Sequence, residues 1–307
     1  MDNSVLLVSP APHVRATHTT QRIMLDVILA LVPALIASVW IFGWRALAVT
    51  ALCVAVCVAS EWLFEKLCKR ENTVSDLSAV VTGILLAFNL PVSIPLWQAA
   101  LGSVVAIVVV KQLFGGIGKN FANPAITARI VLLLSFAGSM SDFSTKNDAI
   151  SSATPLSAMT AGEPLPSLLD LFLGKHGGSL GETCAVALLI GGVYLLIRRV
   201  ITWHTPVAFV ATVFLFTWLL GENPLQHILM GGLLLGAFFM ATDYSTTPPT
   251  RMGKLIFGIG CGLITVLIRV FGNYPEGVSF AILFMNILTP YISAWTRKKP
   301  FGGVRAK

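Results

Sequence analysis

The sequence that decides the fold is GILLAFNLP, residues 83–91, an apolar segment that stops at an Asn-Leu-Pro end. Proline has no backbone N–H and blocks helix continuation, so a helix entering this segment must end early. A second apolar segment ends in MATDYSTTP, residues 240–248, and aligns with the first. At the same spacing Phe114-Gly115 falls opposite Phe271-Gly272. With a short gap, the residues after 123–124 also match those after 275–277, which indicates an internal repeat.

The composition around these segments is that of an integral membrane protein. Of the 307 residues, 55% are hydrophobic and 11% are charged, and the mean hydropathy is +0.81. Soluble domains carry about 25% charged residues, so this chain cannot cover its surface with polar side chains. Apolar runs near the spanning length of about 20 residues recur along the chain, which favours helices over a barrel.

Ten membrane segments are expected, and the chain therefore divides into two five-helix halves. An odd number of spans per half inverts the second half relative to the first, which is a transporter-type architecture. We predict an all-α polytopic protein of two inverted five-helix repeats, with short, broken third and eighth spans. These two spans either line a site near the midplane or are ordinary short helices that end in loops. The expected spans are 23–41, 46–64, 77–90, 97–114, 124–140, 184–198, 205–220, 227–242, 255–271 and 278–295.

The basic residues predict the orientation. With the N-terminus in the cytoplasm, seventeen Lys and Arg residues fall on the inner side and four on the outer side. This distribution places both termini in the cytoplasm, and it assigns the net charge of +7 to membrane orientation and not to a nucleic-acid partner. The four outer residues are Arg45, Lys146, Lys175 and Arg269. The organisation is then a cytoplasmic segment 1–22, repeats 23–140 and 184–295, an extracytoplasmic loop 141–183 and a basic cytoplasmic tail 296–307.

The long outer loop contains the run DAISSATP, residues 148–155. This run resembles the flavinylation signature D-x-x-[ST]-G-A-[ST], whose last residue joins FMN through a phosphoester. The chemistry requires an exposed hydroxyl with small neighbours, so that a transferase and a phosphate can approach. The chain departs from the signature at Ser152, where the pattern has glycine, and a Ser/Thr-rich loop is the alternative interpretation.

Three further motifs extend the resemblance to a whole family. They are GGIGKNFANPA at 115–125, ATDYSTTP at 241–248 and GNYPEGVSFAIL at 272–283. Together they resemble the D subunit of the Rnf electron-transport complex. They match the B subunit of the Na⁺-translocating NADH:quinone reductase more loosely. The resemblance covers essentially the whole chain. The glycine-rich stretch is not a nucleotide-binding loop, because it lacks the Lys-Ser/Thr ending and the strand–turn–helix context.

The resemblance implies a function for the chain. Members are ten-helix subunits of a bacterial cell (inner) membrane complex that passes electrons between ferredoxin and NAD⁺ while moving Na⁺ or H⁺. They carry a covalent FMN on the outer loop, and a second, non-covalent flavin is possible. The implied partners are the A, B, C, E and G subunits of the Rnf complex and an FMN transferase. Such a chain is an electron-relay subunit and not a complete enzyme. The resemblance assigns the FMN to Thr154 and the transferase motif to Asp148, Ser151, Ser152 and Ala153, with Thr160 as the fallback.

Other polar residues near span ends are weaker candidates for cofactor or ion contacts. They are Lys119, Asn120, Asn123, Asp243 and Thr246. An Asn-Pro helix start is also a structural explanation for Asn123, and Asp243 is either a cation ligand or a solvated loop acid. Asp26 and Glu61 are expected to reach the cytoplasmic headgroup region. The five cysteines form no CxxC pair, and the histidines show no metal-ligand spacing, so no metal site is predicted.

Two other functions compete with the electron relay. The inverted repeat alone is compatible with a channel or secondary transporter for an ion or small solute. The departure at Ser152 is compatible with a structural scaffold that has lost its flavin. The outer loop discriminates between these functions, because a transporter needs no covalently loaded hydroxyl.

Overall fold

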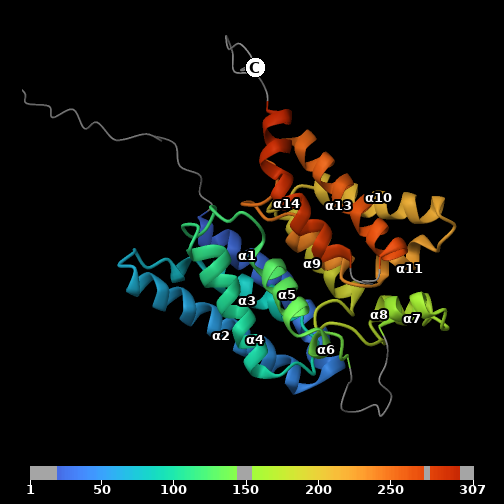
Figure 1. The fold of residues 1–307 in the computed structure, drawn as a ribbon, viewed down its shortest axis with the longest axis horizontal. Coiled ribbons are helices and arrows are strands. Elements are labelled where there is room, and N and C mark those ends of the chain that lie inside the picture. The colour runs from blue at the N-terminus through green and yellow to red at the C-terminus, as the bar shows by residue number, and fades with distance from the viewer. Residues whose placement is uncertain (1–18, 144–153, 273–276, 298–307) are drawn as a thin grey trace, which may run out of the picture.

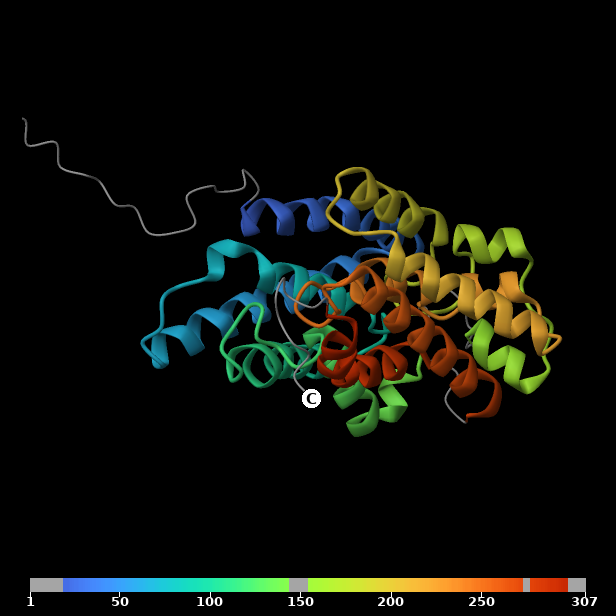
Figure 2. The same cartoon turned by 90° about the horizontal axis from the view of Figure 1, so that it is seen from above.

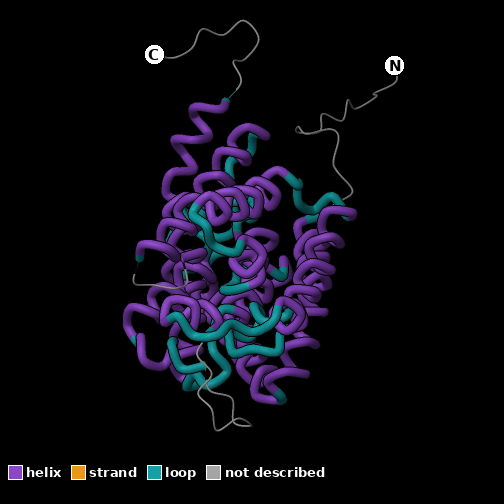
Figure 3. Tube along the Cα trace, turned by 90° about the vertical axis from the view of Figure 1, so that its right-hand side faces the viewer, coloured by secondary structure: helices purple, strands orange, loops and turns teal. Residues whose placement is uncertain are grey.

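The computed structural model describes residues 19–143, 154–272 and 277–297 (Figure 1). Every regular element in these ranges is a helix (Figure 3). Four helices are long and apolar enough to cross a membrane. The prediction of an all-helical membrane protein is therefore confirmed. The four long helices are α1 (Thr20–Phe42), α2 (Trp44–Leu67), α13 (Arg251–Phe271) and α14 (Gly277–Thr296).

Shorter helices occupy the other expected spans. The fourth span begins as an α-helix and continues as a π-helix, and the eighth consists of three short pieces. The number of these segments that cross the membrane, and the inverted relation of the two halves, stay predictions. The helices are α3 (Ser78–Phe88), α4 (Leu96–Val104), η2 (Val105–Gln112), α5 (Pro124–Ser135), α9 (Ala185–Ile197), α10 (His204–Leu219), α11 (Pro224–Leu229), α12 (Leu233–Leu235) and η3 (Gly236–Met240).

The structure refines two expected boundaries. The segment expected at 124–140 divides at Phe136, whose φ and ψ of −134° and 50° separate α5 from α6 (Ala137–Met140). The outer loop contains two short helices, α7 (Pro155–Ala161) and α8 (Leu168–Leu173). A further 3₁₀ turn, η1 (Val74–Asp76), precedes α3.

Glycines set the closest approaches between helices. A Cβ on Gly83 of α3 would lie 2.7 Å from the Val54 Cα of α2, and one on Gly258 of α13 would lie 2.8 Å from the Thr205 carbonyl oxygen. Helices in lipid gain their association from such close backbone packing, because the hydrophobic effect does not distinguish a neighbouring helix from an acyl chain. The glycines therefore fix where α3 crosses α2 and where α13 crosses α10.

The two halves of the chain pack through helices at corresponding places. The first helix of the N-terminal half, α1, packs on the first helix of the C-terminal half, α9 (Figure 2). The last helices expected in each half, α5 and α14, also contact each other. Like-with-like contacts of this kind are what a two-fold relation between the halves predicts.

The seven tryptophans form two exposed groups near helix ends. Trp40, Trp44, Trp97 and Trp218 lie near the end of α1, the start of α2, the start of α4 and the end of α10, with exposures from 60% to 89%. Trp62, Trp203 and Trp295 lie near the opposite ends of α2 and α10 and the end of α14, with exposures from 47% to 82%. Tryptophan is enriched at both membrane–water interfaces, so we expect the two groups to lie at the two interfaces.

The described ends of the chain lie toward the same side of the molecule. In Figure 1 the start of α1 and the end of α14 are at the upper side of the molecule, and α6, α7 and α8 are at the lower side. This arrangement agrees with the expectation that the termini share one side and that the outer loop faces the other. The side of the membrane that each end occupies stays a prediction.

Several charges that were assigned to loops or headgroups are buried. Glu61 is fully buried, and its Oε1 lies 2.6 Å from the Lys111 ammonium, so the expectation that Glu61 reaches the headgroup region is wrong. Asp26 is also buried; it accepts a hydrogen bond from the Tyr194 hydroxyl at 3.0 Å and pairs with Arg198 at 3.2 Å. Pairing explains the burial, since a charge leaves water only when a partner compensates it. Lys111, Arg129 and Arg269, which lie within expected spans and were used only to orient the chain, are buried too.

Candidate functional site

The early ends of α3 and η3 meet inside the molecule. Asn89, which follows α3, places its Nδ2 3.7 Å from the Sδ of Met240, the last residue of η3. The Asn123 side chain donates to the Met240 carbonyl oxygen at 3.5 Å. The two segments that the repeat predicts to be equivalent therefore converge on one place, where side-chain amides satisfy the backbone at the helix ends.

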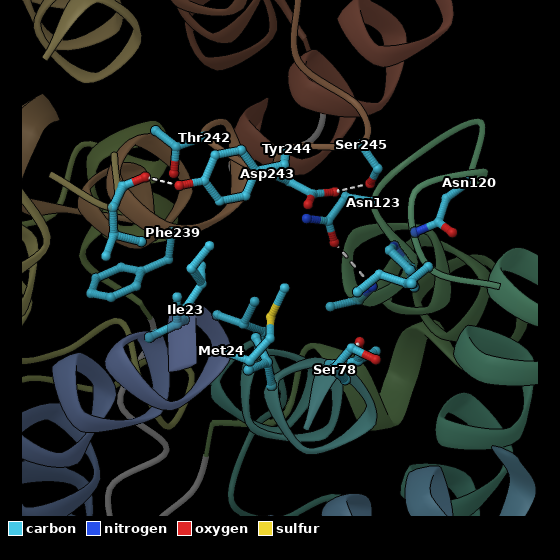
Figure 4. A pocket seen from close by; sticks show the side chains of 18 of the residues that line it. Ile23, Met24, Ser78, Asn120, Asn123, Phe239, Thr242, Asp243, Tyr244 and Ser245 are labelled. Atoms are coloured by element: carbon cyan, nitrogen blue, oxygen red, sulfur yellow. Dashed lines mark hydrogen bonds between the residues drawn. The ribbon is translucent and has the colours of Figure 1, made fainter. Parts of the chain in front are cut away.

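A cavity of about 90 Å³ lies next to this convergence (Figure 4). Its lining comes from both halves of the chain, and it includes three of the predicted contact residues, Asn120, Asn123 and Asp243. The Asn120 Oδ1 is buried without a hydrogen-bond partner in the described part of the chain. The structure therefore brings together an amide and a carboxylate that are more than a hundred residues apart in the sequence.

Asp243 is held by its own turn. Its Oδ2 accepts hydrogen bonds from the hydroxyls of Ser245 at 2.8 Å and Thr246 at 3.1 Å. Burial raises the pKa of the Asp243 carboxyl, and the hydroxyls and the backbone N–H groups of this turn act in the opposite direction. The carboxyl is thus a partly desolvated acceptor beside the cavity, which differs from an ordinary solvated loop acid. Thr246 is buried and does not line the cavity, and Lys119 is exposed.

Asn123 has a structural role. Its Oδ1 accepts from the backbone N–H groups of Ala125 at 3.1 Å and Ile126 at 3.3 Å, with Pro124 in the first helical position. This is the helix start expected from the Asn-Pro sequence, and it satisfies two donors that would otherwise be orphaned. The same side chain faces the cavity, so the cap also fixes its position there (Figure 4).

Thr154, the predicted attachment residue, begins the outer segment, by which we mean residues 154–183 of the predicted outer loop. It is the N-cap of α7, with Oγ1 accepting from the Ser157 backbone N–H at 3.2 Å and lying 3.0 Å from the Ser157 hydroxyl. The residue is 8% exposed, so the expectation of an exposed hydroxyl is wrong for this conformation. The Thr-Pro helix start turns the hydroxyl onto the first turn of α7, and His176, Glu182 and Gly231 lie beside it. Asp148, Ser151, Ser152 and Ala153 lie outside the described residues.

A polar pair adjoins Thr154. His176 and Glu182 line a cavity of about 10 Å³ together with Thr154 and Gly231. Burial lowers the pKa of the His176 imidazole, and backbone hydrogen bonds oppose the shift, so the ring is neutral at pH 7. Glu182 is buried and forms an ion pair with Arg129 at 3.3 Å. Neither residue was singled out from the sequence, because a lone His and a lone loop acid carry no spacing signal.

Arg129 joins the outer segment to both halves. Beyond Glu182, its guanidinium donates to Asn89 Oδ1 at 3.1 Å and to the Ser279 hydroxyl of α14 at 2.7 Å. Arg269 makes a comparable set of contacts to the backbone carbonyls of His227, Met230 and Gly231 at 2.5, 3.0 and 2.9 Å. Both residues were missed as site residues, although an arginine inside an apolar run is itself a signal of a buried partner.

Comparisons with known proteins give the family context. A sequence profile of the NQR2, RnfD, RnfE family matches residues 7–302. A relative from Acetobacterium woodii, named as the D subunit of a Na⁺-translocating ferredoxin:NAD⁺ oxidoreductase complex, is 49% identical over 100% of this chain and 98% of its own length. The D subunit of the proton-translocating complex of Clostridium ljungdahlii is 39% identical over 97% of each chain. The D subunit of an ion-translocating oxidoreductase complex of Escherichia coli is 35% identical over 97% of this chain and 99% of its own.

Proposed function

The chain belongs to the NQR2, RnfD, RnfE family, and on that premise we propose that it is the D-type membrane subunit of a bacterial ion-translocating ferredoxin:NAD⁺ oxidoreductase complex. In this role it relays electrons through a covalent flavin on Thr154, and the other Rnf subunits are its partners. The observation that carries the proposal is the end-to-end match to relatives that are named as D subunits of such complexes. The transported ion stays open, since one relative is named for Na⁺ and another for protons.

The chemistry of Thr154 is compatible with a phosphoester. Esterification removes the hydroxyl proton but leaves an oxygen lone pair, so Oγ1 can still accept from the Ser157 backbone N–H. The adjoining cavity of about 10 Å³ has room for roughly one water molecule, so a flavin cannot lie inside it. Loading by an FMN transferase therefore requires α7 to leave the position that buries Thr154. The flavin supplies the redox chemistry, and the chain fixes where it acts.

A substitution of Thr154 tests its assignment as the attachment residue directly. Thr154→Val keeps the β-branched shape but removes the oxygen that an ester needs. Co-expression with an FMN transferase should give a native chain that is heavier by about 440 Da and fluoresces in a denaturing gel, because the flavin is covalent. The variant should lose both signals and still insert in the membrane. Thr160→Val is the matched control and should keep them. Fluorescence retained by Thr154→Val would contradict the assignment.

The second, non-covalent flavin is proposed without assigned residues. The cavity beside Asp243 measures about 90 Å³, below the range of about 300–1,000 Å³ typical of ligand pockets. A flavin in this cavity would need the surrounding helices to separate.

The cavity favours one alternative, an ion channel or secondary transporter. α5 begins at this cavity, η3 ends just before Asp243, and the partly buried Asp243 carboxylate lines the cavity. Interrupted helices beside such a group are the arrangement that transporters use for their sites. Vesicles that contain the purified chain and are loaded with an ion or solute separate the two functions. A transporter moves the ion or solute across the vesicle membrane even when the chain carries no flavin. An electron-relay subunit without its partner subunits shows oxidation and reduction of its flavin but no transport.

A further inference from the structure

The helix that covers the Thr154 hydroxyl is short and is attached at one place. α7 has seven residues, and a helix of that length is not stable in water without docking. In the described part of the chain it makes no extensive contact with another helix. Its first turn is held by a small buried cluster of Leu156, Leu171 and Met230, which is separate from the main core. The stability of α7 therefore depends on this cluster.

Leu156 lies directly on the backbone of Gly231. The leucine is 2% exposed, and a Cβ on Gly231 would lie 2.0 Å from its Cδ1. Gly231 and Gly232 have φ values of 64° and 65°, which glycine adopts without strain. Any side chain at position 231 would occupy the place of the Leu156 side chain. The docking of α7 thus requires glycine at this turn.

The turn is fixed from the membrane helices. Arg269 of α13 is 2% exposed and donates to the Gly231 carbonyl oxygen at 2.9 Å. A Cβ on Gly232 would lie 2.4 Å from Oε1 of Glu182, whose carboxylate pairs with Arg129 of α5 at 3.3 Å. The turn is therefore held by buried charges, whereas α7 is held on it by apolar contacts. Of the two, α7 is the part that can leave.

The docked position closes the Thr154 hydroxyl to a flavin donor. An FMN phosphoester forms when Oγ1 bonds to the phosphorus of a phosphoanhydride donor, in line with the P–O bond that breaks. The leaving phosphate takes the electron pair of that bond, and the hydroxyl proton passes to solvent. Here Oγ1 faces Ser157 and a cavity of about 10 Å³, which holds about one water molecule. Release of Leu156 melts α7, and the N-cap contacts of Thr154 are lost with it.

We propose that α7 is a lid over the FMN attachment site, held shut by the contact of Leu156 with Gly231, and that the open fraction of the lid sets the rate of FMN transfer. The inference rests on the proposed function, because it takes Thr154 as the attachment residue. The chain exchanges between docked and undocked α7, and the transferase acts only on the undocked form. Once loaded, the chain has no room for a phosphate beside docked Thr154, so α7 stays undocked.

The first test measures the rate of loading. The full chain, purified in detergent without flavin, is incubated with limiting FMN transferase and flavin adenine dinucleotide, and the gain in mass is followed. Leu156→Ala should load about tenfold faster or more, because truncation of a buried leucine removes much of the docking free energy. Gly231→Ala should also load faster, since its methyl group displaces Leu156.

Two control variants should load at the native rate. Leu169→Ala truncates a leucine of α8 that is 71% exposed. Gly221→Ala places alanine at a φ of 81°, as strained as at position 231, but its Cβ meets nothing within 4 Å. If Gly231→Ala is not monodisperse in gel filtration, Leu156→Ala decides the test, because it leaves the glycine turn unchanged.

The second test measures the lid without flavin chemistry. Amide hydrogen exchange of the Ser157 and Ala158 N–H groups should be faster in unloaded Leu156→Ala than in the unloaded native chain, because both groups donate to Thr154 only when α7 is formed. Loading of the native chain should speed the same amides. Unchanged exchange in Leu156→Ala would overturn the lid, and so would faster exchange with a native loading rate. If no chain gains mass, the assignment of Thr154 fails, and the exchange alone decides whether Leu156 holds α7.

Discussion

At the residue scale, Arg129 and Glu182 show why buried charges are informative in this chain. Both are at most 6% exposed, and they form an ion pair at 3.3 Å between α5 and the outer segment. Arg129 also donates to Asn89 and Ser279, so one side chain connects the end of α3, the start of α14 and the segment that carries Thr154. Removing Glu182 takes away the carboxylate that compensates the buried guanidinium.

Glu182→Gln should therefore destabilise the protein. Breaking a buried pair by removing one partner costs about 3–5 kcal/mol, and the remaining hydrogen bonds of Arg129 place this case near the lower end. The measurement is the midpoint temperature of unfolding in detergent. A native gel or gel filtration then checks that the variant is monodisperse. Glu163→Gln, at an exposed position of the same segment, is the control and should leave the midpoint unchanged. Equal midpoints for the two variants would show that the pair is not stabilising.

At the element scale, glycines decide how closely the helices approach. Gly258 and Gly262 lie one turn apart on α13 and face α10, where a Cβ would lie 2.8 Å from the Thr205 carbonyl oxygen and 2.6 Å from the Thr212 Cβ. Membrane helices associate through such small-residue stripes. Between these glycines, Ile259 is 48% exposed, so the stripe is confined to one face of the helix.

Gly258→Ala should move α13 away from α10. Overpacking of a close contact costs about 1–3 kcal/mol, because the backbone of α10 cannot give way as a flexible side chain could. The thermal midpoint in detergent should therefore fall. Gly138→Ala in α6, where a Cβ meets nothing within 4 Å, is the matched control. It should be neutral or slightly stabilising, since alanine restricts the unfolded chain more than glycine. A midpoint unchanged by Gly258→Ala would mean that the two helices are not in close backbone contact.

At the scale of the whole molecule, the orientation in the membrane can be tested by labelling residues near opposite sides of the structure. We expect Thr20→Cys and Thr296→Cys to react with an impermeant maleimide only in inside-out vesicles. Asp142→Cys should react only in right-side-out vesicles, because the predicted topology puts it on the outer side. The background should carry Cys68→Ser, since Cys68 is an exposed native thiol. Labelling of Thr20→Cys and Asp142→Cys from the same side would refute the topology.

The sequence indicated much of this architecture through patterns that are local. The early helix ends at Phe88 and Met240, the capping role of Asn123 and the membrane class depend on proline, asparagine and apolar runs acting within a few residues. The meeting of Asn89 with Met240 joins the two segments that the repeat aligns, although in the alignment Asn89 falls opposite Thr246 and not opposite Met240. The burial of Thr154 was not predicted, since it depends on the docking of α7 beside residues that are distant in the sequence, such as His176 and Gly231.

By itself, then, the sequence determined the membrane class, the family motifs, the early ends of the third and eighth spans and Thr154 as the candidate attachment residue. Only the tertiary structure decided which charges pair and which cavities form. Glu61 with Lys111, and Glu182 with Arg129, are separated by about 50 residues, and no spacing rule joins them. Hydropathy treats each ionisable residue as an isolated cost and assigns it to a loop or headgroup. Folding offsets that cost when a second chain segment brings an opposite charge, and this depends on helix packing in three dimensions.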